Sequence, residues 1–143
     1  RIENFSKYAT IVVFCCSATG VLLPPYVIYK SDFVYDLWCQ NGSNGEPCCT
    51  EDCCKDGSSY NRTKSGWIDR ITFTDLFKKV FLPHAKRLKG RKVLAGDNLA
   101  THFTPEVIRL CEENDISFCF FVPNSTHISQ PLDQSFFRAF KAA

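Results

Sequence analysis

Apolar and β-branched residues gather near the start of the chain. The run Thr10–Cys16 is continuously apolar after its first residue, as expected of a strand that is covered on both faces. Ser17–Gly20 has the composition of a turn, and Val21–Tyr29 is a second β-rich run. The two runs predict a β-hairpin, whose second strand lies near a sheet edge or a bulge because Pro24 and Pro25 have no N–H to donate.

The segment Ala9–Tyr29 contains no charged residue, so a membrane span has to be weighed against two buried strands. Gly20 and the Pro24–Pro25 pair interrupt any helix drawn through this segment. The first residues also lack the basic start and apolar stretch of a signal peptide. Two strands account for the pattern better, and no membrane partner is predicted.

Irregular and helical segments follow. Gly, Ser, Asn, Asp and Cys dominate Asp36–Tyr60, which predicts a loop. A helix is predicted from Thr74, as its N-cap, to Leu82, with Pro83 ending it.

Strands and helices alternate in the last part of the chain. Lys92–Asp97 predicts a short strand that ends in a carboxylate. Pro105 begins a helix that Asn114 caps, and Ile116–Val122 is a further strand. A last helix is predicted to begin near Pro131. Strands alternating with helices after a hairpin predict an α/β domain with a mixed sheet.

The 143 residues are enough for one domain with one hydrophobic core. A hydrophobic share of 45% excludes wholesale disorder. The formal net charge is only +2, so binding to nucleic acid has to be argued from local features. The nine cysteines are an odd number without a signal peptide, which favours reduced thiols in an intracellular protein.

Five cysteines crowd the predicted loop. Thiolates at this density can hold Zn²⁺, but the spacing is not a paired C-x-x-C pattern and no histidine lies near. A loop of free thiols is the favoured interpretation, and a zinc site is the alternative. The residues concerned are Cys39, Cys48, Cys49, Cys53 and Cys54. The other four are interpreted as small buried hydrophobes: Cys15, Cys16, Cys111 and Cys119.

Two carboxylates lie where α/β domains place their sites. Asp97 ends a predicted strand, and Asp133 is in the first turn of a predicted helix, where the helix dipole keeps a carboxylate ionised. Thirty-five residues separate them. Taken alone, each is better explained as a capping or turn residue.

The residues around these carboxylates are more specific. They read Gly96–His102, Pro123–His127 and Gln130–Asp133. These segments resemble the DDE endonuclease domain of pogo-type transposases, a group that includes the Tigger and Jerky elements and the host protein centromere protein B. The resemblance covers nearly the whole chain and extends upstream through Ser17–Gly20, Leu23–Tyr26, Tyr60–Trp67 and Leu82–His84.

The resemblance implies an RNase H-like fold, in which three carboxylates hold two divalent ions, Mg²⁺ or Mn²⁺, that promote attack on DNA phosphodiester bonds. Asp97 resembles the second carboxylate and Asp133 the third, and hard carboxylate oxygens suit these ions. Four further residues are implied to lie near the metals, where they would orient ligands or contact the DNA backbone: Asn98, His102, His127 and Gln130. An ordinary loop or capping role is an equal alternative for both histidines.

The first carboxylate of the family has no clear counterpart. Glu3 is the only acid before Thr10, and no strand pattern surrounds it. The resemblance therefore places this carboxylate, with the central strand of the sheet, before Arg1. The strands that begin at Thr10 and Lys92 would then have open edges. We expect a chain of this extent to be poorly stable alone, or its sheet to close differently.

Positive charge is densest between Lys78 and Lys92. The ordinary interpretation is a solvated helix face and loop, whereas in a transposase-like domain these side chains would meet DNA phosphates. Trp67 is interpreted as a core residue and not as a platform for stacking bases. The residues expected to contact the DNA backbone are Lys64, Lys86, Arg87, Lys89, Arg91 and Lys92.

The sequence thus predicts a partial DDE endonuclease domain over residues 1–143, with a Cys-rich insertion at about 36–60. Its expected role is DNA binding in the nucleus, without catalytic competence unless the first carboxylate is supplied. A domesticated, non-catalytic DNA- or chromatin-interaction domain is the second hypothesis. A zinc-stabilised interaction module is the third.

Overall fold

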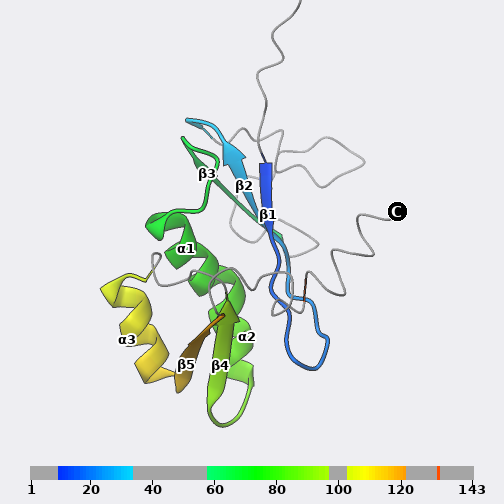
Figure 1. Ribbon diagram of the computed structural model, residues 1–143, viewed down its shortest axis with the longest axis vertical. Coiled ribbons are helices and arrows are strands. Elements are labelled where there is room, and N and C mark those ends of the chain that lie inside the picture. Colours follow the sequence, from blue (N-terminus) through cyan, green and yellow to red (C-terminus); the bar gives the residue numbers. More distant parts are fainter. Residues whose placement is uncertain (1–9, 34–57, 97–102, 122–131, 133–143) are drawn as a thin grey trace, which may run out of the picture. The chain divides into compact units, whose positions relative to one another are not determined.

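The computed structural model describes residues 10–33, 58–96, 103–121 and 132 (Figure 1). The chain divides into two compact units between Phe81 and Leu82. In chain order the elements are β1 (Thr10–Val13), β2 (Tyr26–Lys30), β3 (Ser59–Thr63), α1 (Arg70–Leu76), the π-helical turn η2 (Phe77–Phe81), α2 (Leu82–Arg87), β4 (Lys92–Gly96), α3 (Pro105–Glu113) and β5 (Ile116–Phe120).

β1 and β2 form the predicted antiparallel hairpin. Its turn is closed by Ser17 N, which donates to the Val21 carbonyl oxygen at 2.8 Å, and Gly20 supplies the positive φ of 87°. β2 begins at Tyr26 and not at Val21, because the preceding Pro24–Pro25 pair has no N–H for a sheet ladder.

β3 pairs with β2 in parallel and completes a mixed sheet with the order β1-β2-β3. The loop predicted over Asp36–Tyr60 is therefore wrong at its end, and residues 34–57 lie outside the described part of the chain. Ser59–Thr63 shows no apolar alternation, so its extended form depends on pairing with β2. Cross-strand stacking adds to that pairing, since the rings of Tyr29 and Tyr60 are 6.4 Å apart.

α1, η2 and α2 form one continuous helical segment from Arg70 to Arg87. The predicted start at Thr74 is wrong, because Asp69 is the N-cap. The Asp69 carboxylate accepts from Thr72 N at 2.9 Å, and the Thr72 hydroxyl accepts from Asp69 N at 2.9 Å. Thr74 lies inside α1, where its hydroxyl donates to the Arg70 carbonyl oxygen at 2.8 Å.

Pro83 was expected to end this helix, and that prediction is also wrong. Pro83 is the second residue of α2 and follows η2 directly. Inside a regular α-helix, proline removes one hydrogen bond and its ring meets the carbonyl oxygen four residues earlier. We attribute the continuation to η2, because a π-helical turn changes that spacing.

The core of the first unit joins the hairpin to the helix. Tyr26 and Ile28 lie on one face of β2 and are fully buried. Leu76 and Val80 pack against them at an i, i+4 spacing, and Leu23 completes the cluster. The strand face and the helix face therefore meet in one apolar layer.

The second unit follows the predicted order of strand, helix and strand. β4 and β5 are parallel, and α3 connects them. Thr104 caps α3 by accepting from Val107 N at 3.3 Å, and Pro105 occupies its first turn. Asn114 caps the other end, where its Nδ2 donates to the Leu110 carbonyl oxygen at 2.7 Å. The helix and both strands are confirmed within one or two residues.

The α/β class predicted for the chain is confirmed, with mixed strand pairing in small sheets. Among the described strands, β1 pairs only with β2, and β4 pairs only with β5.

A tight turn connects β3 to α1. Gly66 N donates to the Thr63 carbonyl oxygen at 3.2 Å, and Gly66 has a φ of 77°. A Cβ atom on Gly66 would lie 2.9 Å from Lys30 Cβ. Trp67, the next residue, has an exposed fraction of 71%, so its prediction as a core residue is wrong. The turn directs its side chain away from the apolar layer.

Replacing Gly66 by alanine is expected to destabilise the chain more than replacing Gly20. Gly20→Ala has only the cost of a left-handed conformation, about 1 kcal/mol, since nothing lies within 4 Å of the added carbon. Gly66→Ala has the same cost and also a contact with strand β2, so we expect a loss of about 2 kcal/mol or more. Urea unfolding followed by circular dichroism measures both. Equal losses would show that the contact with Lys30 is unimportant.

Candidate metal site and DNA-binding surface

The two carboxylates predicted to hold metal, Asp97 and Asp133, lie outside the described residues. The structure describes the residue before each. Gly96 ends β4, where its carbonyl oxygen accepts from Phe121 N at 3.2 Å. Leu132 is helical and half-buried. Asp97 thus follows the carboxyl end of a parallel strand, the position at which α/β sheets build their sites.

The four residues expected near the metals, Asn98, His102, His127 and Gln130, also lie outside the described part. Their roles stay predictions. Within the residues that the structure describes, no group of three or more His, Cys, Asp and Glu side chains could hold a metal ion.

Four of the expected DNA-contacting residues are exposed at the end of α2 and in the turn before β4. These are Lys86, Arg87, Lys89 and Arg91, and Gly90 supplies the turn with a φ of 78°. We call these four residues the basic segment. Their exposure leaves the positive charge accessible to a phosphate backbone.

The other two expected contacts have partners within the protein. Lys92 Nζ donates to the Asn114 carbonyl oxygen at 2.9 Å, at the C-terminal end of α3. Lys64 is exposed, with Nζ 3.9 Å from an Asp32 carboxylate oxygen. Such a loose surface pair contributes little to stability, so Lys64 remains available to another anion.

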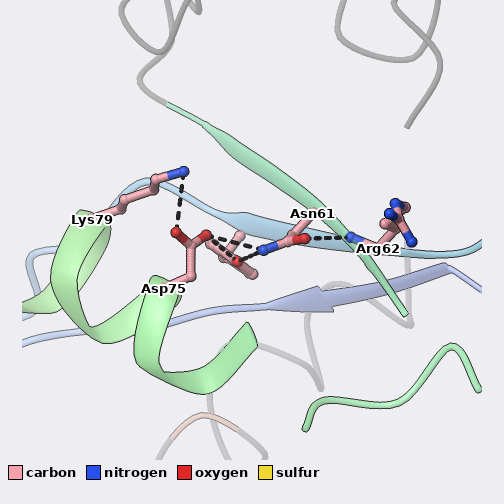
Figure 2. Close-up of polar contacts among 5 residues, drawn as sticks. Asn61, Arg62, Asp75 and Lys79 are labelled. Carbon is pink, nitrogen blue, oxygen red and sulfur yellow. Dashed lines mark hydrogen bonds and ion pairs between the residues drawn. The ribbon is translucent and has the colours of Figure 1, made fainter. Parts of the chain in front are cut away.

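A polar network that sequence reasoning missed joins β2, β3 and α1 (Figure 2). The Asp75 carboxylate accepts from the Tyr26 hydroxyl at 2.5 Å and from Asn61 Nδ2 at 3.1 Å. Asn61 Nδ2 also donates to the Tyr26 hydroxyl oxygen at 2.7 Å. Lys79 Nζ lies 3.1 Å from the second carboxylate oxygen. The i, i+4 spacing of Asp75 and Lys79 is the one sequence pattern that could have indicated part of this network.

Burial determines the chemistry of this network. It raises the pKa of Tyr26 far above its usual range, and the hydrogen bond to Asp75 raises it further, whereas the one from Asn61 lowers it. Tyr26 therefore remains a neutral donor throughout the physiological pH range. The network holds the helix to the sheet.

The described cysteines divide into two kinds. Burial is the main cause that raises the pKa of both Cys15 and Cys111 to about 11. The neighbouring Cys16 adds to this effect for Cys15, and Glu112 adds to it for Cys111. Both thiols are therefore protonated at neutral pH. Cys16 and Cys119 are exposed, so their prediction as buried residues is wrong. Cys16 lies beyond the end of β1, and Cys119 is near the end of β5. The five cysteines of the predicted loop lie outside the described residues.

The Tyr26 hydroxyl is expected to make stability fall at alkaline pH. The folded state holds this proton above about pH 10, where an unfolded tyrosine releases it, so rising pH favours unfolding. We expect an added loss of about 1 kcal/mol between pH 9 and pH 11. Urea unfolding at several pH values measures it. Tyr26→Phe should abolish this component and Tyr60→Phe should keep it. An unchanged pH profile in Tyr26→Phe would contradict the assignment.

A curated relative is similar to the chain. The "MFS-type transporter clz9" of Cochliobolus lunatus is 25% identical over 128 residues, which are 89% of this chain and 13% of that protein. The chain therefore spans about an eighth of the length of this relative. None of the described helices here is long and apolar enough to cross a membrane. No solved structure matches the chain.

The family model described as DDE superfamily endonuclease matches residues 6–143. The match extends over the hairpin, the helical segment, and the β4, α3 and β5 unit, and it includes Asp97 and Asp133. The chain therefore belongs to the DDE superfamily of endonucleases.

Proposed function

We propose that this domain binds DNA and contributes two carboxylates to a divalent-metal site for phosphodiester cleavage. The observation that carries the proposal is the family match over residues 6–143, combined with the position of Asp97 directly after strand β4. Substrates of DDE endonucleases are DNA strands, and the exposed basic segment offers phosphate contacts outside the metal site.

Asp97 and Asp133 are the residues proposed to hold the ions. Their carboxylate oxygens are the hard ligands that Mg²⁺ and Mn²⁺ prefer. A divalent ion so held lowers the pKa of a bound water and stabilises charge on phosphate oxygens. A third carboxylate is part of this site in the family, and Glu3 is a poor substitute for it. The proposal is therefore that these residues bind metal and DNA, and that cleavage needs the third carboxylate.

We further propose a pogo-type origin and a nuclear location. The subfamily rests on the motifs Pro123–His127 and Gln130–Asp133, and the location on access to chromosomal DNA. A domesticated, non-catalytic domain would keep the DNA contacts without the metal. Metal affinity and DNA affinity, measured separately, distinguish the two roles.

Replacing either carboxylate is expected to weaken metal binding. Asp97→Asn and Asp133→Asn should each lower the affinity for Mn²⁺ at least about tenfold, since each removes a charged oxygen ligand. Calorimetric titration of the 143-residue chain measures it. Asp115→Asn is the control, because Asp115 is exposed and its φ of 53° also suits asparagine. Affinities equal to that of the unaltered chain in both variants would refute the metal site.

Replacing the four residues of the basic segment by alanine is expected to weaken binding to duplex DNA and to reduce the salt dependence of that binding. Alanine at Lys86, Arg87, Lys89 and Arg91 should lower the slope of log affinity against log salt by about 3 to 4, if each side chain meets one phosphate. Fluorescence anisotropy with a labelled duplex at several salt concentrations measures the slope.

Arg109→Ala is the matched control for this experiment. Arg109 is an exposed cation of the same unit, but its guanidinium lies 3.6 Å from a Glu113 oxygen on α3. Its removal should leave the slope unchanged. The quadruple variant should lower the slope by about 1 for each residue replaced. If Arg109→Ala also lowered the slope by about 1, any exposed cation would contribute equally, and the basic segment would not be a specific DNA contact.

A further inference from the structure

Three exposed apolar side chains lie after β2, in the turn between β3 and α1, and in the first turn of α1. The exposed fractions are 67% for Phe33, 71% for Trp67 and 77% for Ile71. The two strand ends lie side by side, since Ser31 N donates to the Thr63 carbonyl oxygen at 3.1 Å. Exposed apolar side chains on three segments that are neighbours in this unit make the surface beside the turn a candidate binding surface.

The backbone of Trp67 is fixed although its ring is exposed. Its carbonyl oxygen accepts from the Thr63 hydroxyl at 2.9 Å, and its N–H donates to the Ser65 hydroxyl oxygen at 3.2 Å. Gly66, immediately before it, is buried against Lys30. The indole is therefore presented by a rigid turn. Stacking of a ligand on it would cost the protein chain little conformational entropy.

The chain segments on either side of this ring, and the strand end against Gly66, are rich in basic residues. The segments 30–33 and 62–70 carry four basic and two acidic residues: Lys30, Arg62, Lys64, Arg70, Asp32 and Asp69. One acid is already used, because the Asp69 carboxylate caps α1. The Arg62 guanidinium lies 5.8 Å from the centre of the Phe33 ring, which leaves its charge at the surface. The patch is thus aromatic and basic together.

This combination favours nucleic acid over a protein partner. Aromatic side chains among cations bind unpaired bases by stacking, while the cations meet the phosphates. Bases inside a duplex cannot reach an exposed indole in this way. We propose that Trp67 is a stacking platform for unpaired bases of a DNA strand, with Lys64 and Lys30 at its phosphates. The proposal deepens the DNA-binding function proposed above and rests on it.

The test compares single-stranded and duplex DNA. A labelled oligothymidylate of about 20 nucleotides is titrated with the 143-residue chain at low salt. Trp67→Ala should weaken this binding about tenfold and leave affinity for duplex DNA and the salt slope unchanged, because no charge is removed. Trp67→Phe should keep most of the affinity, and Trp67→Leu should behave like the alanine variant. Circular dichroism confirms that each variant is folded.

Fluorescence gives a second readout. The chain has two tryptophans, so Trp38→Phe leaves Trp67 as the only indole. Saturation with the oligothymidylate should quench its emission, and Trp38→Phe alone should leave affinity unchanged. Unquenched emission, or a Trp67→Leu variant that binds like the unaltered chain, would overturn base stacking.

The outcomes separate this inference from the DNA-binding proposal. If Trp67→Ala binds the single strand normally while the basic-segment variant loses duplex DNA, the stacking platform is refuted and the proposed function stands. If neither DNA binds at low salt, both are refuted. If Trp67→Ala changes only the sedimentation of the chain, the patch is a self-association surface and the inference is wrong.

Discussion

The carboxylate of Asp75 is the interaction on which the first unit depends. It accepts hydrogen bonds from β2 and β3 and pairs with a lysine one helical turn further on, so a single side chain joins three elements. A carboxylate in a part-buried position is costly unless it is satisfied, and here Tyr26, Asn61 and Lys79 provide the compensation. The apolar layer around Leu76 gives the packing energy, but the network fixes the register of the helix on the sheet.

The position of α1 on the sheet determines which side chains are exposed in the turn that precedes the helix. With α1 held on the sheet, the turn before it must span a short distance, and glycine at position 66 allows the chain to do so. The same turn gives Trp67 its exposed position. In the second unit, α3 connects the parallel strands β4 and β5, and Asp97 follows the end of β4 in the chain. Asp97 and Trp67, which are proposed to bind metal and DNA, thus follow directly after a strand and a tight turn.

Sequence reasoning succeeded where the signal was local. The hairpin, β4, α3 and β5 each have a turn, cap or apolar run that determines them without help from distant residues. It failed for β3, whose polar residues become a strand only because β2 is beside them. It failed also at Pro83 and Trp67, where a π-helical turn and a left-handed glycine redirect the chain. The proposed metal ligands rest on resemblance alone, since no local pattern distinguishes them from turn residues.

The parallel pairing of β2 with β3 affects how this domain can vary in length. A chain that leaves the end of one parallel strand must travel back before it enters the next, so a long return between Lys30 and Ser59 is obligatory. Once such a return exists, doubling its length adds only about 0.6 kcal/mol of closure entropy. Insertions between these two strands are therefore nearly neutral for folding, and the Cys-rich segment is free to diverge while the pairing of β2 with β3 is kept.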